Sequence, residues 1–428
     1  MATTGNDSFD FRSVLLSGFL PAALFAIGEG AIIPIIPIAA DSLGASLAFA
    51  GFVASLILVG ELIGDVPSGI VVARIGERNA MIGAALVSVV GLVVATTAAN
   101  AWVLALGVFL VGVSTAVFAL ARHAYMTTAI PLRIRARALS SLGGVFRFGY
   151  FVGPFIAAGV IHLTGTTSSA FWIHVVCCLA AATVLLVLRD PATGTRGLRL
   201  PPRASRRSAD HATEPPADTG AQFVQQEAQG LFRTIRANGA VLLRLGSGAG
   251  LIGAMRAGRQ VILPLWAVSV GLDDSTAALV IGIAGAVDFA LFYTSGQIMD
   301  RWGRLASALP CMLGLSISYF LLAWSGHLDA RVGWFVAIAM GMSLANGVGS
   351  GILMTLGADL APRDAPAPFL GAWRFTGDFG SAAAPLLISG VTAVASIAVA
   401  SGVMGVLGLV GAGILLRYVP RYLPRPLR

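Results

Sequence analysis

The chain has 428 residues, of which 57% are hydrophobic and only 11% are charged, and its mean hydropathy is +0.85. Soluble globular proteins carry about 25% charged residues, so this composition excludes an ordinary water-soluble fold of the same length. It indicates a membrane protein, in which a net charge of +8 reflects loop topology rather than nucleic-acid binding.

Apolar segments of about 20 residues, long enough to cross the hydrocarbon core of a bilayer, recur along the whole chain. We expect an all-α membrane protein with twelve transmembrane helices in two six-helix bundles. The expected spans are residues 13–40, 46–72, 80–99, 101–124, 139–163, 169–188, 240–270, 275–299, 305–325, 332–358, 367–393 and 396–416.

Arginine gathers in alternate loops, in the central segment and in the C-terminal tail. The positive-inside rule therefore places both termini and the central segment in the cytoplasm of a protein of the plasma (inner) membrane. The acidic start, with Asp7 and Asp10, lacks the basic region of a signal peptide, so we expect the first span to be retained.

Residues 190–237 separate an N-terminal bundle, residues 1–189, from a C-terminal bundle with a basic tail, residues 238–428. This segment is rich in Pro, Arg, Ser and Asp, a composition typical of disorder. Its last part places Phe223 and Phe232 among polar residues, which suggests a short interfacial helix. A simple tether between the bundles is the alternative.

The second half of the chain repeats the first at a constant spacing of 227 residues, without a gap. Identical residues at this spacing occur throughout both halves: Pro37 and Pro264, Gly44 and Gly271, Gly69 and Gly296, Arg74 and Arg301, Gly76 and Gly303, Gly144 and Gly371, Arg147 and Arg374, and Phe148 and Phe375. Two parallel copies of a membrane bundle are typical of transporters that rock one half against the other.

Ionisable residues also lie inside the apolar segments, where they are costly and are therefore functional or paired. Glu61 and Asp65 are one helical turn apart in the second span and share a face. The other ionisable residues inside the apolar segments are Glu29, Arg147, Arg256, Arg259, Asp288, Arg374 and Asp378. The histidines form no spaced cluster and no nucleotide-binding loop or nucleophile–base set occurs, so we expect no metal, no cofactor and no enzyme.

The loop after the eighth span reads Gly296-Gln-Ile-Met-Asp300-Arg301-Trp-Gly303-Arg304. It fits the pattern G-x-L-x-D-R-x-G-R, and through it the chain resembles the major facilitator superfamily, in particular its twelve-span drug:proton antiporters. An Asp at a helix end beside arginines can cap amides and pair with charge, so this loop is expected to act as a latch.

The first copy of this loop keeps Gly69, Arg74 and Gly76 but has Ala73 and Glu77 in place of the family's Asp and final Arg. Its capacity to latch is therefore reduced. Two further motifs of the antiporter branch, expected to bend helices or pack them closely, are Gly28-x5-Pro34-x2-Pro37 and Gly149-x3-Gly153-Pro154. Val108 stands where the family places an intramembrane Arg.

The resemblance implies that span 2 packs on span 11 and span 5 on span 8, between the halves. Arg147 would then face Asp288, and Arg374 would face Glu61 or Asp65. These pairs would act as gates, as static structural contacts or as substrate ligands.

The resemblance also implies a central cavity lined by spans 1, 4, 7 and 10. Glu29 is the first candidate proton site, with its repeat mate Arg256 opposite, and a permanent pair of the two is the alternative. Asp65 and Asp378 are the reserve proton sites. The other cavity candidates are Phe25, Arg259 and Asn346.

The implied function is proton-driven export of small lipophilic or cationic compounds, with the proton gradient as energy source. The expected partners are a small-molecule substrate, protons and the lipid bilayer, and we expect a monomer. One alternative is an exporter of a specific polar metabolite or amphipathic lipid, because the buried charge suits a charged substrate. The other is a membrane sensor or scaffold that transports nothing.

Overall fold

The computed structural model describes residues 15–129, 132–188, 236–361 and 366–423. In these ranges the chain is helical and contains no β-strand. Eleven of the described helices or helix pairs are long and apolar enough to cross a membrane, and a bent helix pair at the start supplies a twelfth span. The predicted all-α fold with twelve spans is confirmed.

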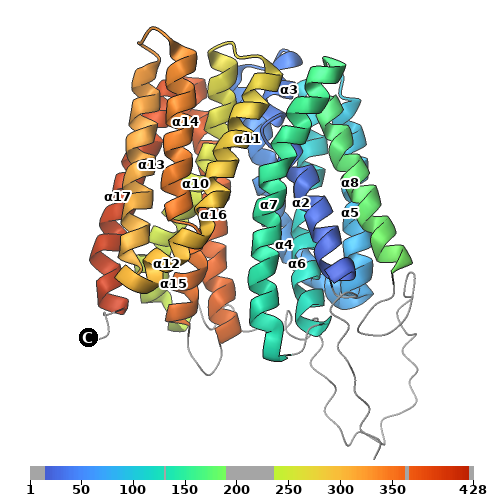
Figure 1. Ribbon diagram of the computed structural model, residues 1–428, viewed down its shortest axis with the longest axis vertical. Coiled ribbons are helices and arrows are strands. Elements are labelled where there is room, and N and C mark those ends of the chain that lie inside the picture. The colour runs from blue at the N-terminus through green and yellow to red at the C-terminus, as the bar shows by residue number, and fades with distance from the viewer. Residues whose placement is uncertain (1–14, 130–131, 189–235, 362–365, 424–428) are drawn as a thin grey trace, which may run out of the picture.

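The N-terminal half forms one bundle, seen on the right of Figure 1. Its elements are η1 (Leu15–Phe19), α2 (Leu20–Ile32), α3 (Ile36–Ser42), α4 (Leu47–Ile75), α5 (Glu77–Thr96), α6 (Ala101–Ala129), α7 (Leu132–Thr164) and α8 (Ser169–Val187). The central segment, including the suggested interfacial helix, falls outside the described residues apart from its last two positions.

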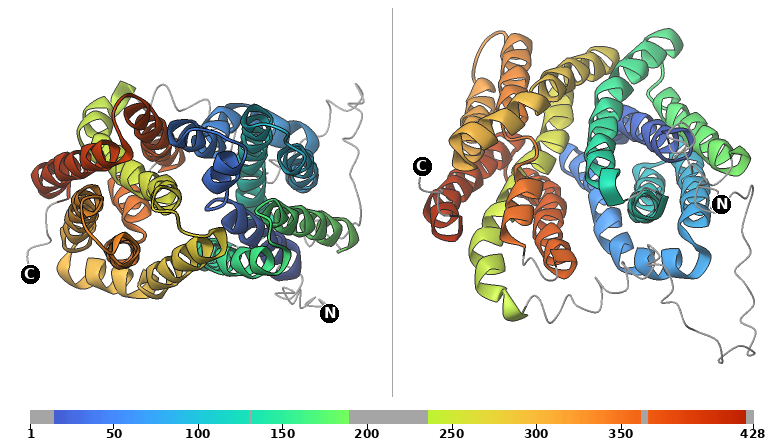
Figure 2. Two further views of the ribbon diagram at one scale, coloured as in Figure 1. Left: turned by 90° about the horizontal axis from the view of Figure 1, so that it is seen from above. Right: turned by 60° about the horizontal axis from the view of Figure 1, so that its bottom comes forward.

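The C-terminal half forms the second bundle. Its helices are α10 (Gly239–Ser269), α11 (Asp274–Ala290), α12 (Phe292–Trp302), α13 (Leu305–Ser325), α14 (Arg331–Val348), α15 (Ile352–Leu360), α16 (Pro366–Val394) and α17 (Ile397–Tyr422). Viewed along the helices, the two bundles stand side by side (Figure 2).

The halves meet along two helix pairs, α7 with α11 and α4 with α16. These are spans 5 with 8 and 2 with 11, as the family resemblance implied. Near the start of α4 the Ser389 hydroxyl donates to the Ala48 carbonyl, with an Oγ–O distance of 2.7 Å. Near the start of α11 Ser275 donates to the Ala158 carbonyl at 3.1 Å. The halves are thus joined at the upper end of Figure 1.

The 227-residue repeat is visible in the backbone. Gly44 and Gly271 have φ angles of +79° and +72°, and Gly76 and Gly303 have φ angles of +83° and +90°. Glycine adopts such angles without the steric cost that a Cβ imposes. The two halves therefore close equivalent loops with equivalent turns.

Glycines also allow one helix in each half to approach another closely. A Cβ on Gly153 of α7 would lie 2.5 Å from the backbone nitrogen of Ala31 in α2, and one on Gly149 would lie equally close to Ala26. In the second half a Cβ on Gly380 of α16 would overlap the backbone oxygen of Gly250 in α10. Gly149 and Gly153 thus allow span 5 to pack closely on span 1. Pro154 lies inside α7, which continues through it as one helix.

Three spans are interrupted. The first bends by 40° between α2 and α3, where Pro34 lies in the break and Pro37 in the first turn of α3. Gly28 allows α2 to pack closely on α8, because a Cβ at this position would overlap the His174 ring. Spans 8 and 10, predicted as single helices, are divided into α11 with α12 and α14 with α15.

Candidate functional site

A cavity of about 260 Å³ lies between the two halves. Its acidic and basic lining residues come from the interface helices α4 and α16. The lining comprises Ile33, Ile36, Ala54, Ile57, Leu58, Glu61, Leu62, Asp65, Thr115, Ala116, Ala119, Tyr150, Gln260, Val261, Arg374, Asp378 and Ser381. Spans from both bundles therefore contribute to one cavity, which is partly open because the Arg374 and Asp378 side chains are 59% and 40% exposed.

Three carboxylates and one guanidinium lie in this lining. Glu61 and Asp65 project from successive turns of α4, as the sequence spacing predicted. On α16 the Arg374 Nε binds the Asp378 Oδ2 at 3.2 Å. The structure thus brings Arg374 to the same cavity as Glu61 and Asp65. When all four groups are ionised the lining carries a surplus of negative charge, which favours a cation in the cavity.

Glu29 lies behind this lining and is only 1% exposed. The hydroxyl of Tyr150, on α7, donates a hydrogen bond to the Glu29 Oε2 at 2.9 Å. The Glu29 Oε1 has no hydrogen-bond partner among the described residues. Because Tyr150 also lines the cavity, its side chain connects the cavity to the buried carboxyl group.

Two expectations for the cavity are wrong. Glu29 and Arg256 do not face each other, because Glu29 bonds to Tyr150 while the Arg256 Nη2 donates to the Gly349 carbonyl at 2.5 Å. Phe25 does not line the cavity. It is 1% exposed and stacks on Phe118 with ring centroids 4.1 Å apart, within the N-terminal bundle.

A second polar cluster lies outside the cavity lining, among α10, α11 and α14. The Arg259 Nη2 is 3.3 Å from the Asp288 Oδ2, and its Nη1 donates to Ser343 at 2.8 Å. The Asn346 amide donates to the same Asp288 oxygen at 2.6 Å. Arg259 and Asn346 are therefore engaged with Asp288 inside the C-terminal bundle rather than in the cavity.

The expected ion pair between Arg147 and Asp288 is replaced by a different contact between the halves. The Arg147 Nη1 donates to the Ser350 Oγ at 2.5 Å, and its guanidinium lies over the Phe292 ring with Cζ 4.5 Å from the centroid. Asp288 is instead bound by Arg259 on the neighbouring helix α10. Spans 5 and 8 pack together as expected, but the Asp288 carboxylate binds Arg259 rather than Arg147.

The break in span 10 is a feature that the predicted continuous helix missed. Its freed carbonyls are satisfied by side chains, because Ser295 donates to Val348 and Ser350, and Ser307 donates to Val348, at 2.6–2.7 Å. Gly351, with φ at +81°, allows the chain to turn into α15. The available signal was the alternating glycine of Gly347-Val-Gly349-Ser-Gly351, since glycine-interrupted spans mark binding regions of transporters.

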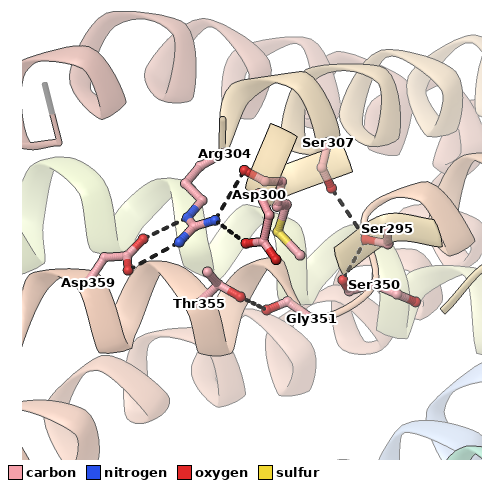
Figure 3. Close-up of polar contacts among 9 residues, drawn as sticks. Ser295, Asp300, Arg304, Ser307, Ser350, Gly351, Thr355 and Asp359 are labelled. Atoms are coloured by element: carbon pink, nitrogen blue, oxygen red, sulfur yellow. Dashed lines mark hydrogen bonds and ion pairs between the residues drawn. The ribbon is translucent and has the colours of Figure 1, made fainter. Parts of the chain in front are cut away.

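Figure 3 shows the second-half loop motif beside this break. Arg304 binds both oxygens of Asp359 in α15, with Nε–Oδ2 at 2.7 Å and Nη2–Oδ1 at 3.4 Å. Its Nη1 also contacts the Asp300 Oδ1 at 3.2 Å. The hydrogen bond from Arg304 to the Asp359 carboxylate raises the pKa of the guanidinium. The motif therefore ties α12 to α15 through Asp359, a residue that the sequence motif does not contain.

The first-half copy of the motif makes a different contact. Arg78, next to the Glu77 that replaces the family's arginine, donates through Nε to the Leu185 carbonyl at 2.7 Å, and through Nη2 to the Leu188 carbonyl. These carbonyls lie at the end of α8, where helix carbonyls lack intrahelical partners. In this half the arginine caps a helix instead of forming a carboxylate clamp.

Comparisons with known proteins agree with this architecture. The model of the Major Facilitator Superfamily matches residues 18–385. An uncharacterized MFS-type transporter of Mycobacterium tuberculosis, found in strains CDC 1551 and H37Rv, is 28% identical over 191 residues. That match covers 45% of this chain and 26% of the relative, so the chain spans about a quarter of the length of these curated relatives.

Solved transporter structures share the fold at low sequence identity. A POT family transporter in complex with 5-aminolevulinic acid has a TM-score of 0.75 at 11% identity, covering 96% of this chain and 97% of that one. The xylose transporter XylE from E. coli, in a partially occluded inward open conformation, has a TM-score of 0.66 at 16% identity, covering 96% and 99%. The family match over most of the chain shows that the protein is a multi-pass membrane protein of the Major Facilitator Superfamily, and these solved structures share its fold.

Proposed function

We propose that the protein is a proton-coupled exporter of small lipophilic or cationic compounds in the plasma membrane, with both termini in the cytoplasm. The observation that carries this proposal is the cavity between the halves, lined by Glu61, Asp65 and Asp378 with Arg374 as the basic lining residue. A drug-sized cation would find a matching charge there, and the apolar residues of α3, α4 and α6 would contact its hydrocarbon part.

Competition between a proton and the cation would couple the two movements. A cationic substrate and a proton both lower the negative charge of the same lining, so binding of one weakens binding of the other. Protonation from outside would then release the substrate, and deprotonation inside would prepare the cavity for the next molecule. Glu29 does not line the cavity, but its hydrogen bond with the lining residue Tyr150 would let it take part in this exchange.

Alternating access would follow from relative movement of the two bundles. The hydrogen bonds of Ser389 with Ala48 and of Ser275 with Ala158 would have to break for the cavity to open at that end. These two contacts add little to the cost of opening, because each is a single neutral hydrogen bond of about 1 kcal/mol net.

A transporter of one polar metabolite is the second candidate. Arg374 lines the cavity, and three further arginines, at positions 147, 256 and 259, lie on the helices that contribute Tyr150 and Gln260 to the lining. These four arginines favour a substrate that carries an acidic group. A sensor or scaffold has less support, since it needs no charged cavity between mobile halves.

Proton flux in inverted membrane vesicles with an acidic interior tests the proposal. Addition of a transported cationic drug would release protons from vesicles that contain the wild type, and Glu29→Gln would abolish this release. If no cation from a broad panel moves protons through correctly inserted wild-type protein, cation export is refuted and the metabolite candidate takes its place.

A further inference from the structure

Two arginines from opposite halves of the protein meet at the break in span 10. Arg147 of α7 donates to the Ser350 hydroxyl, and Arg256 of α10 donates to the Gly349 carbonyl, both at 2.5 Å. Gly349 and Ser350 are consecutive, with Cα atoms about 3.8 Å apart. Two guanidinium groups are therefore held close together in a region of low dielectric, where like charges repel strongly.

The carboxylate on α11 in this region does not neutralise both arginines. Asp288 Oδ2 is shared by Arg259 and Asn346, which leaves three arginines and one described acid in this cluster. The Arg256 Nε is shielded from solvent and has no hydrogen-bond partner in the described structure. The cluster therefore has a surplus of positive charge and an unused donor, and an anion would compensate for both.

Two further features relate this positive cluster to the cavity and to the binding of an anion. Arg147 lies three residues before Tyr150 on α7, and Arg256 lies four residues before Gln260 on α10. Tyr150 and Gln260 line the cavity, so each arginine shares a helix face with a lining residue one turn away. In addition, α15 begins at Ile352 directly after the break, and helix N-termini attract negative charge.

The cavity acids and the arginine pair lie on different helices, and each group has members from both halves. The acids lie on α4 and α16, and the arginine pair lies on α7 and α10. We propose that Arg147 and Arg256 form a subsite for the acidic group of the transported compound, so that the substrate is a small zwitterion with an amine and a carboxylate. This inference rests on the proposed function, because the amine is assigned to the acid-lined cavity.

A purely structural role for the arginines makes a different prediction. If Arg256 only satisfies a carbonyl freed by the helix break, and Arg147 only joins the halves, their neutralisation would weaken every ligand to a similar extent. A subsite for an acidic group would instead show its effect only on ligands that carry one. The two roles can therefore be separated by comparing ligands that differ in a single group.

Phenethylamine, phenylalanine and phenylacetate form such a set, since they carry the amine alone, both groups, and the carboxylate alone. Binding of each compound would be measured by thermal shift of the purified full-length protein. Proton release driven by each compound would be measured in inverted vesicles. The variants are Arg147→Gln, Arg256→Gln and the charge-retaining Arg147→Lys. Arg244→Gln is the matched control, because Arg244 is exposed on the same helix as Arg256.

In the wild type we expect phenylalanine to bind at least tenfold more tightly than phenethylamine, as a charge-assisted contact provides. Arg147→Gln and Arg256→Gln should abolish this advantage while phenethylamine affinity stays within about twofold, whereas Arg147→Lys keeps part of it. Arg244→Gln should match the wild type.

Equal loss of both ligands in the two glutamine variants overturns the inference, as does a wild type that binds phenylalanine no better than phenethylamine. If neither phenethylamine nor any other cation of the broad panel releases protons, the proposed export of cations fails on its own. The subsite is then judged by phenylacetate alone, whose binding to the wild type but not to Arg147→Gln supports it, and whose failure to bind refutes it.

Discussion

Tyr150 connects the buried Glu29 to the cavity between the halves: its hydroxyl donates to the Glu29 Oε2 at 2.9 Å, and its side chain forms part of the cavity lining. A carboxyl group that is 1% exposed needs such a connection if it is to exchange a proton with the cavity. The relationship explains how a residue outside the lining can influence what binds inside it.

Replacement of Tyr150 by Phe should therefore slow proton exchange more than it weakens substrate binding. Proton transfer through a positioned group contributes roughly 10²-fold or more to a rate. We expect Tyr150→Phe to reduce substrate-driven proton release in vesicles at least tenfold, with cation affinity within about twofold of the wild type. Tyr293→Phe, at a position 74% exposed, is the control and should behave as the wild type. A proportional loss of both quantities would contradict the relay.

The cavity acids should set the affinity for cations. Removing one charge from a charge-assisted contact costs about 1.5–3 kcal/mol, or roughly 10- to 100-fold in affinity. Asp65→Asn and Asp378→Asn should each show such a loss for a monovalent cation, measured by equilibrium binding to the purified protein. Asp41→Asn removes the same charge at an exposed position and should have no effect. Unchanged affinity in both cavity variants would show that the cation binds elsewhere.

The clamp between Arg304 and Asp359 should influence transport more than stability. The side chains are 25% and 31% exposed, and surface ion pairs contribute at most about 1 kcal/mol to stability. Asp359→Asn should lower the thermal midpoint only slightly but change the transport rate severalfold, because α15 is no longer tied to α12. A double-mutant cycle with Arg304→Gln should give a non-additive rate effect. Additive effects would mean that the two residues act independently.

Close packing of α16 on α10 should make Gly380 intolerant of a side chain. An added Cβ would overlap the backbone of Gly250, and overpacking of this kind costs about 1–3 kcal/mol or more. Gly380→Ala should therefore lower thermal stability in detergent markedly. On the same helix Gly390 has open space around it, so Gly390→Ala should be neutral or slightly stabilising. Equal stability of the two variants would refute the packing argument.

The helix cap at Asp273 should be sensitive to acid. Its Oδ2 accepts from the Thr276 amide at 2.9 Å, and the hydrogen bonds at Thr276 lower the pKa of Asp273 from its ordinary value of 3.8. The contribution of the ionised cap is therefore complete above about pH 4 and is lost as the pH falls through the lowered value. Asp273→Ala should cost about 1 kcal/mol near neutral pH. In thermal denaturation Asp273→Asn should retain most of the stability and lose this part of the acid dependence.

The sequence by itself determined the class and the symmetry of the protein. A continuous apolar run of about 20 residues crosses a bilayer as a helix, which satisfies its backbone N–H and C=O groups within the segment. The 227-residue repeat places equivalent glycines at equivalent turns, as Gly76 and Gly303 show. The sequence also predicts that charged residues lie within the spans, because residues such as Glu61 and Asp65 interrupt otherwise apolar segments. Span length and the positions of charges are local properties of the chain, and the repeat can be recognised because its two copies align without a gap.

Only the tertiary structure decided which charged groups meet. Arg147 could have paired with Asp288 on the adjacent span, but Arg259 lies closer to that carboxylate and Ser350 lies within reach of Arg147. At the break in span 10 the Gly349 carbonyl accepts from Arg256 and the Ser350 hydroxyl accepts from Arg147. Glycine at Gly351 and the hydrogen bonds of Ser295 and Ser307 to the carbonyls at the break stabilise this conformation. Pairing in a buried interface is a competition between partners at ångström distances, and residue spacing along the chain does not encode those distances.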